Sequence, residues 1–209
     1  MQYGFYFDGT RCTGCKTCVL ACKDNKNLTS EQAFRQVYEF EGADGFTADD
    51  AGCWTVGSFT YYVSSACNHC ATPACVEACP VGTMTKHEDT GLVYNDPETC
   101  IGCGSCVNAC PYGAPQVDTE IQKSIKCDGC HARVEAGEMP ICVAACPQRA
   151  LEFGDIEELR AKYGDTAAIA PLPDPSQTTP SVCINPPVCF VDWSEADKGT
   201  VVNAMELRA

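Results

Sequence analysis

The sequence has few basic residues, few histidines and no long apolar run. Its 14 lysines and arginines stand against 28 acidic residues, and the resulting formal charge of −14 repels nucleic acid and anionic membrane surfaces. No apolar run approaches the roughly 20 residues needed to cross a bilayer, and the first residues show no basic region followed by an apolar core. We therefore expect no nucleic-acid partner, no membrane span and no export signal in this chain.

Motifs for catalysis are also missing from the sequence. It has no glycine-rich phosphate loop, no nucleophile motif and no paired carboxylates. The three histidines, His69, His87 and His131, are too scattered for a haem or a Rieske centre. These absences predict that the chain has no catalytic residues and no small-molecule substrate of its own.

Cysteine, by contrast, is far more abundant than in ordinary proteins. Sixteen of the 19 cysteines fall into four runs of four. The runs are Cys12, Cys15, Cys18 and Cys22; Cys67, Cys70, Cys75 and Cys79; Cys100, Cys103, Cys106 and Cys110; and Cys127, Cys130, Cys142 and Cys146. Proline follows the last three runs, where it ends a helix, whereas Lys23 follows the first. A repeated spacing of this kind indicates metal centres, because their ligands must converge on one point.

The first and third runs have the spacing C-x2-C-x2-C-x3-C, which is typical of bacterial ferredoxins. In that pattern three thiolates hold one [4Fe-4S] cluster and the fourth binds a second cluster. The second and fourth runs have the same pattern with a longer gap before Cys75 and before Cys142. Gly14, Gly102 and Gly129 lie among the close-set cysteines, where they let backbone amides approach cluster sulfides.

A disulfide scaffold and structural zinc sites are the two alternative explanations for the cysteines. A disulfide framework has no reason to repeat a fixed spacing. Zinc ribbons use two CxxC pairs separated by a long loop, which does not fit three cysteines in nearly equal steps. The fourth run, "CDGC…CVAAC", fits zinc about as well as a cluster. A zinc-stabilised interaction scaffold is therefore the alternative of a different class.

Between the runs the sequence is typical of small ferredoxin modules. Residues 83–100 predict two short strands around a turn at Glu88 to Gly91, and "TCVLAC" and "SCVNAC" predict short helical turns. The second and third runs are close enough to form one two-cluster module, with the first and fourth runs paired around it. This predicts an α+β fold of two bacterial dicluster ferredoxin-like modules, nested with pseudo-twofold symmetry. Pairing of the runs in chain order stays open.

We divide the chain into six segments on this basis. They are residues 3–32, 58–89, 91–120 and 121–154 for the four cluster motifs, residues 33–57 for an insertion, and residues 155–209 for a C-terminal helix and arm. In and after the insertion, "FRQVYEF" and "GSFTYYV" predict a β-hairpin packed on the module.

The C-terminal segment begins with a helix signal. "DIEELRAKYG" predicts a short helix with a capping pair, Asp155 and Glu158, that ends at Gly164. The following "PLPDPSQTTPSVCINPP" is too rich in proline for regular structure, which predicts an extended arm wrapped on a partner, or else a disordered tail. Cys53, Cys183 and Cys189 lie outside the runs as small side chains, and in an exported complex Cys183 and Cys189 could form a local disulfide.

Five stretches of the sequence carry a resemblance to a known family. They are "QYGFYFDGTRCTGCKTCVLACKD", "SACNHCATPACVEACPVGTM", "CIGCGSCVNACPYGAPQ", "KCDGC…PICVAACPQRALEFGDIEELRAKYGD" and "AAIAPLP". Over nearly its whole length the chain resembles the four-cluster iron-sulfur subunit of dimethyl sulfoxide reductase and its relatives in the molybdopterin oxidoreductase family. Cluster motifs alone occur in many polyferredoxins, so the match beyond Cys146 makes the resemblance specific.

The resemblance implies a subunit that passes electrons between a molybdopterin-containing catalytic subunit and a membrane anchor that exchanges electrons with quinone. It also implies four [4Fe-4S] clusters with exchanged ligands. The implied sets are Cys12, Cys15, Cys18 and Cys146 for cluster 1; Cys22, Cys127, Cys130 and Cys142 for cluster 2; Cys79, Cys100, Cys103 and Cys106 for cluster 3; and Cys67, Cys70, Cys75 and Cys110 for cluster 4. Cluster 1 would face the catalytic subunit and cluster 4 the anchor. Some nitrate reductase relatives have tryptophan at the position of Cys103 and a three-iron cluster there, so the cysteine implies four irons in every cluster.

The resemblance leaves the identity of the complex open. A formate dehydrogenase, a hydrogenase, or a thiosulfate or polysulfide reductase would use a similar electron-transfer subunit, and the substrate and the direction of electron flow are decided elsewhere. Relatives without a signal are often exported already folded with a catalytic partner that has one. We therefore expect a peripheral membrane complex on the outer face, with the cytoplasmic face as the alternative.

The clusters would add negative charge to an already acidic chain. A [4Fe-4S]2+ core with four thiolates carries about −2, so four clusters would take the chain from −14 to about −22. Lys16, Lys126 and Arg149 lie beside cluster motifs and are candidates to offset this charge, with a solvated surface position as the alternative for each. His69 and His131 border ligands and are candidate hydrogen-bond donors to them.

Overall fold

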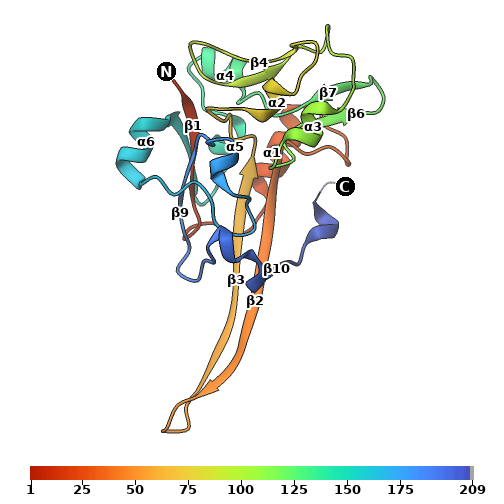
Figure 1. The fold of residues 1–209 in the computed structure, drawn as a ribbon. Helices are drawn as coiled ribbons and strands as arrows, with labels where there is room; N and C mark the ends of the chain where they lie inside the picture. The colour runs from red at the N-terminus through yellow and green to blue at the C-terminus, as the bar shows by residue number, and fades with distance from the viewer. Residues whose placement is uncertain (208–209) are drawn as a thin grey trace.

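The computed structural model describes residues 1–207, with the exception of the side chains of residues 43–47. A body built from short helices and strands carries one long hairpin that projects away from it (Figure 1). The strands are β1 Tyr3–Asp8, β2 Arg35–Ala48, β3 Trp54–Ala66, β4 Met84–Lys86, β5 Val93–Asn95, β6 Gln116–Asp118, β7 Lys123–Ile125, β8 Leu151–Asp155, β9 Val182–Asn185 and β10 Thr200–Val201. The α-helices are α1 Thr17–Asn25, α2 Ala74–Glu77, α3 Ser105–Ala109, α4 His131–Glu135, α5 Ile141–Ala144 and α6 Ile156–Tyr163. Three 3-10 helices follow, η1 Pro175–Gln177, η2 Trp193–Lys198 and η3 Ala204–Glu206.

A three-stranded sheet in the order β8-β1-β9 forms the centre of the body. β1 pairs antiparallel with β8 and parallel with β9. Side chains alternate between the two faces of a strand, so Phe5 and Phe7 enter the main core while Tyr6 points to the other face and stacks on Tyr163 of α6. Because both faces are covered, almost every residue of β1 is buried.

The short elements predicted around the cysteine runs are present. β4 and β5 pair antiparallel across the turn expected at residues 88–91, and β6 and β7 form a second small hairpin after the third run. α1 and α3 are the helical turns predicted from "TCVLAC" and "SCVNAC". The predicted C-terminal helix is also confirmed, since the Asp155 side chain accepts hydrogen bonds from the backbone of Glu157 and Glu158 and Gly164 follows its end.

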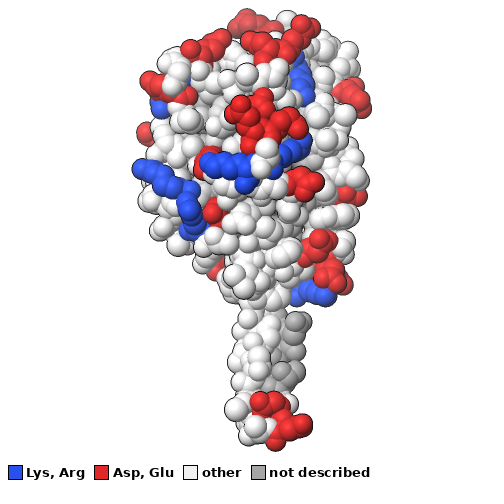
Figure 2. Space-filling model, turned by 90° about the vertical axis from the view of Figure 1, so that its left-hand side faces the viewer, with Lys and Arg blue, Asp and Glu red and all other residues white. Residues whose placement is uncertain are grey.

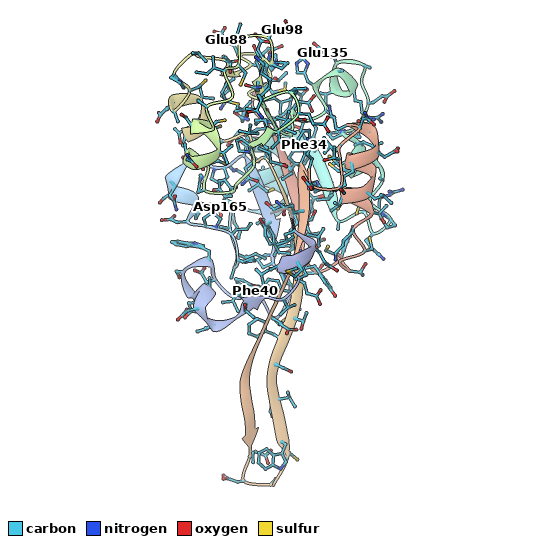
Figure 3. The ribbon with its side chains drawn as sticks, turned by 90° about the vertical axis from the view of Figure 1, so that its right-hand side faces the viewer. Phe34, Phe40, Glu88, Glu98, Glu135 and Asp165 are labelled. Carbon is cyan, nitrogen blue, oxygen red and sulfur yellow. The ribbon has the colours of Figure 1, made fainter. Side chains whose placement is uncertain are left out.

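Residues 35–66 form the long antiparallel hairpin of β2 and β3. Its base packs into the core, where Phe40 lies against Phe59 and Tyr61 and β10 adds a third strand (Figure 3). Its far end stands clear of the body, with Trp54 70% exposed. The exposed Asp49 lies in the turn, where Figure 2 shows acidic atoms at the end of the projection.

The expectation that residues 171–187 have no regular structure is wrong. "VCIN" between two proline-rich stretches forms β9, which occupies the free edge of β1 and buries Val182, Cys183 and Ile184. The chain then runs back along the hairpin, where Asn203 bonds the backbone of Val37 and Glu39. Residues 165–207 therefore pack on the body of their own chain (Figure 1). In the described residues no helix has the length and apolar character needed to span a membrane.

Candidate metal-cluster sites

The sixteen cysteines of the four runs lie in four groups within the body, and each group draws on two runs. Group 1 joins the first run to the end of the fourth, since Cys12, Cys15, Cys18 and Cys146 line one pocket. Burial raises the pKa of Cys12 to about 11, and the neighbouring Cys18, Cys146 and Cys15 raise it as well. Because the four side chains line one small pocket, their sulfurs lie close together.

Group 2 joins the last cysteine of the first run to the fourth run. Burial raises the pKa of Cys22, and the thiolates of Cys127, Cys142 and Cys130 raise it further. Helix α1, which carries Cys22, packs against α5, which carries Cys142. The packing of these two short helices therefore builds the group.

Groups 3 and 4 combine the second and third runs in the same way. Cys79, Cys100, Cys103 and Cys106 line one pocket and form group 3. Group 4 consists of Cys67, Cys70, Cys75 and Cys110. Burial raises the pKa of Cys75 to about 12, and the thiolates of Cys67, Cys110 and Cys70 contribute to this rise.

The arrangement of the sulfurs distinguishes between a single metal ion and a larger cluster. Among the side chains that the structure describes, no group of three or more Cys, His, Asp or Glu residues is placed to hold one metal ion. A tetrahedral zinc site needs all four sulfurs at about 2.3 Å from one ion. A [4Fe-4S] cluster instead binds each thiolate at a separate iron, so it fits groups whose sulfurs are neighbours but do not meet at a point.

Backbone amides donate to the sulfurs at equivalent places of different runs. In the third and fourth runs, the first cysteine accepts from the amide two residues later and the last cysteine from the amide four residues later. These bonds are Gly102 N to Cys100 Sγ at 3.5 Å, Gly129 N to Cys127 Sγ at 3.4 Å, Ala114 N to Cys110 Sγ at 3.5 Å and Ala150 N to Cys146 Sγ at 3.4 Å. Donors of this kind stabilise anionic sulfur and tune cluster potentials.

Hydroxyl groups repeat in the same manner in groups 1 and 3. In the first and third runs, the second cysteine of the run contacts the hydroxyl group of the residue two positions later. The third cysteine of the run contacts the hydroxyl group of a serine that lies on a strand. The pairs are Cys15 with Thr17 at 3.4 Å, Cys103 with Ser105 at 3.3 Å, Cys18 with Ser64 at 3.5 Å and Cys106 with Ser124 at 3.2 Å. The two groups are therefore built on one local plan, although 88 residues separate Cys15 from Cys103 in the numbering.

A glycine stands two residues after the first cysteine of three runs, and in the third and fourth runs steric contacts explain why. Gly102 has φ +69°, and a Cβ there would lie 2.2 Å from the backbone oxygen of Gln122. Gly129 has the same φ, and its Cβ would lie 2.9 Å from Leu92. In the second run His69 occupies the equivalent position with φ +44°. The second run thus places a ring where the other three runs place a glycine.

The His69 ring is fully buried; it stands between Cys67 and Cys70 of group 4 in the sequence and faces Cys127 of group 2. Its Nδ1 accepts a hydrogen bond from the backbone of Val93 at 2.9 Å, so the ring proton is on Nε2, which lies 3.9 Å from Cys127 Sγ. Burial lowers the pKa of His69, which keeps the ring neutral. The expectation of a donor beside a cysteine is thus met by His69, whereas His131 stacks on His87 and pairs with Glu135.

The three candidate cations have different environments. Lys126 is buried and donates to the backbone oxygens of Val93 and Cys127, so its charge lies inside the body. Arg149 donates from an exposed position to the Cys146 oxygen at 2.6 Å. Lys16 forms an ion pair with Glu206. Lys126 alone of these three has the burial that makes a charge strongly felt.

Sequence reasoning missed a further cation, Arg35. The alternation in "FRQVYEF" predicted a strand, and nothing in the neighbouring sequence indicates that Arg35, the first residue of that strand, is buried. In the structure Arg35 is 2% exposed. Burial lowers the pKa of its guanidinium, but the thiolates of Cys142, Cys18 and Cys127 outweigh this and raise it well above the usual value.

Residues that lie beside two cysteine groups at once give the spatial order of the four groups. Arg35 lies beside Cys18 of group 1 and beside Cys127 and Cys142 of group 2. Lys126 contacts the Cys127 backbone and lowers the pKa of Cys110 in group 4, where burial is the larger, opposing effect. Groups 4 and 3 share a small core made of Cys75, Met84, Val93 and Cys106, with Cys79 packed against it. The order is therefore group 1, group 2, group 4, group 3.

Exposed thiols lie at the two ends of this order. Cys15 in group 1 and Cys103 in group 3 are exposed, whereas Cys67, Cys70 and Cys75 in group 4 are buried. The three cysteines outside the runs are all free: Cys53 and Cys189 are exposed, and Cys183 on β9 is fully buried in a small core with Tyr6 of β1 and Leu159 of α6.

The fold and the grouped thiols define a ferredoxin-type protein with several iron-sulfur clusters. In agreement, residues 58–156 match a family model described as "4Fe-4S dicluster domain", and residues 10–27 match one described as "4Fe-4S binding domain".

Known proteins of similar sequence narrow this class. The protein is 55% identical to one chain of the anaerobic dimethyl sulfoxide reductase of Escherichia coli, over 88% of its own length and 89% of the relative's. The probable anaerobic dimethyl sulfoxide reductase chain YnfG of the same organism matches to the same extent. One subunit of the tetrathionate reductase of Salmonella typhimurium is 36% identical over 75% of this chain and 59% of the relative.

The chain therefore belongs to the family of iron-sulfur subunits of the dimethyl sulfoxide reductase type. It is an electron-transfer subunit that carries four [4Fe-4S] clusters and has no catalytic site of its own. The resemblance noted from the sequence is confirmed.

Proposed function

We propose that the chain relays single electrons between a molybdopterin-containing catalytic subunit and a membrane anchor linked to quinone, in a complex like dimethyl sulfoxide reductase. The observation that carries this proposal is the 55% identity, over 88% of the sequence, to a chain of the Escherichia coli enzyme. Hydrogenase-2 operon protein HybA is only 33% identical over 80% of the chain, so an electron subunit of a hydrogenase is the second candidate.

Each group of thiols holds one cluster in this proposal. Groups 1 to 4 supply the ligands of clusters 1 to 4, so that every cluster takes three cysteines from one run and the fourth from another. The mutual repulsion of Cys22 with Cys127, Cys130 and Cys142 supports the exchange of ligands between the first and fourth runs. The repeated amide and hydroxyl contacts support a nested, pseudo-twofold arrangement of two ferredoxin-like modules, from which the hairpin of residues 35–66 projects.

The order of the groups suggests which clusters exchange electrons with partners. Cluster 1 and cluster 3 are the ends of the series, and each has one exposed cysteine, Cys15 or Cys103. Exposed apolar side chains, Val81 and Ile101, surround the Cys103 end. We assign the cluster 3 end to the anchor and the cluster 1 end to the catalytic subunit. This differs from the end that the resemblance implies, because cluster 4 would be interior.

The complex would lie at the membrane surface. The chain itself offers no helix for a span among its described residues, so the anchor would supply it. We propose the outer face of the membrane, by export together with the catalytic subunit.

Substrate-driven oxidation of the clusters tests this function. The complex is isolated anaerobically by a tag on this chain, its molybdopterin content is measured, and the clusters are reduced with a quinol analogue. We expect dimethyl sulfoxide to reoxidise every cluster that the quinol analogue has reduced, as followed by EPR. If molybdopterin is present but the clusters stay reduced after dimethyl sulfoxide is added, this substrate is wrong. If no molybdopterin co-purifies, the proposed partner is wrong.

A further inference from the structure

Arg35 begins the long hairpin and is held inside the body. It pairs with Ala66 across the base of the hairpin, and its side chain is turned inward with 2% of the residue exposed. A buried arginine normally has a carboxylate partner. None of the ion pairs within the described part of the chain involves Arg35. Its positive charge must therefore be balanced by something other than an acidic side chain.

The guanidinium is fixed on several sides. Its Nη1 donates to the Ser64 hydroxyl at 3.0 Å and to the Ser64 carbonyl oxygen at 3.4 Å. Its Cζ lies 5.1 Å from the centroid of the Phe5 ring. Its Nε is buried and has no hydrogen-bond partner. A buried unpaired N–H is costly, so this atom is available to donate to an acceptor bound at the site.

The surrounding thiols belong to two different groups. Ser64, which accepts a hydrogen bond from Arg35, lies 3.5 Å from Cys18 Sγ of group 1. Phe5, over whose ring the guanidinium lies, packs in the core cluster that also contains Cys142 of group 2. Cys127, the other group 2 thiol near Arg35, acts on its charge as well. Each group with its cluster would carry about −2. A guanidinium between two such anions has the compensation that a buried charge needs, and in the low dielectric of the interior its effect on both is strong.

We propose that Arg35 is a positioning residue shared by clusters 1 and 2, whose charge raises the reduction potentials of both and whose Nε–H supplies a hydrogen bond that the bound metal site accepts. The potentials rise because reduction adds an electron to the cluster, and the nearby cation stabilises the more negative, reduced state. Since one residue acts on two neighbouring clusters, it shifts both potentials in the same direction and leaves the difference between them little changed. This inference rests on the proposed ligand sets.

Arginine is required here for its shape as well as its charge. The planar guanidinium presents Nη and Nε donors in fixed directions, so one end can bond Ser64 while the other faces the site. Lysine at the same place would keep the charge without the fork. The two properties can therefore be separated by substitution.

The test compares Arg35→Met and Arg35→Lys with Arg160→Met in the complex isolated through this chain. Arg160 lies on α6, pairs with Glu157 and bonds the Pro180 oxygen, so its removal deletes the same charge away from the four groups. Midpoint potentials of all clusters are measured by anaerobic redox titration with EPR. Cys15→Ser and Cys127→Ser proteins assign the signals of clusters 1 and 2.

We expect Arg35→Met to lower the potentials of clusters 1 and 2 and to leave the other two unchanged, and Arg35→Lys to produce a smaller shift of the same two. Arg160→Met should shift none. If Arg35→Met does not retain clusters 1 and 2, the Arg35→Lys protein decides. Unchanged potentials in every Arg35 variant that retains its clusters, or an equal shift of all four, would overturn the inference. A wild-type protein that lacks four clusters would instead overturn the proposed ligand sets.

Discussion

Gly102 and Gly104 form a matched pair that tests how closely the backbone wraps a cluster. Both have positive φ, +69° and +75°, and they flank Cys103. A Cβ at Gly104 would meet nothing within 4 Å, whereas one at Gly102 would lie 2.2 Å from the backbone oxygen of Gln122. Alanine at either position costs about 1–2 kcal/mol for the left-handed backbone. Gly102→Ala costs a further ~1–3 kcal/mol, because the turn between β6 and β7 must move.

This difference predicts a ratio of rates. If clusters lose iron through local opening, an excess cost of about 1–3 kcal/mol corresponds to about 5- to 150-fold faster release in Gly102→Ala than in Gly104→Ala. Iron release to a chelator is followed anaerobically by absorbance. The shift that Gly102→Ala imposes would also disturb the bond from the Gly102 amide to Cys100 Sγ, so its EPR spectrum should change. Equal rates in the two variants would refute the close approach of Gln122 to this run.

Three further outcomes follow from the structure. Cys103→Ser should leave the far-UV circular dichroism unchanged but alter or remove the EPR signal of one cluster, and an unchanged spectrum and iron content would count against the role of this cysteine. Asp155→Ala removes the cap of α6 and should cost about 1 kcal/mol, which is seen as about fivefold faster hydrogen exchange of the α6 amides; unaltered protection would show that the cap contributes little. Cys183→Ser places a hydroxyl in a fully buried site and should cost about 1–3 kcal/mol in the exchange of β1 and β9, whereas the exposed Cys189→Ser should be neutral; similar exchange in both would contradict the burial of Cys183.

Local sequence signals predicted the elements that depend on neighbouring residues. The turn residues between Met84 and Asn95 place β4 opposite β5, and Asp155 caps the helix that follows it. The spacing inside a cysteine run likewise requires its close-set thiols to lie together. Which fourth thiol joins them depends on the packing of α1 against α5, and the spacing alone left two pairings of the runs open.

Features that depend on distant contacts could not be read in this way. β9 is a strand because β1, about 175 residues earlier, offers a free edge for parallel pairing, and no periodicity in four residues between prolines reveals this. Arg35 looks like an ordinary strand residue beside Gln36, and its burial arises only where the hairpin base meets Phe5 and the fourth cysteine run. Long-range packing therefore created both features that sequence reasoning missed.

Metal analysis of the anaerobically purified protein tests the central claim most directly. Iron, acid-labile sulfide and zinc are determined per chain, and EPR spectra are recorded during reductive titration. Four [4Fe-4S] clusters predict about sixteen iron atoms, an equal amount of sulfide and interacting signals from neighbouring clusters. Zinc without acid-labile sulfide would contradict the account and indicate a structural scaffold in place of an electron carrier.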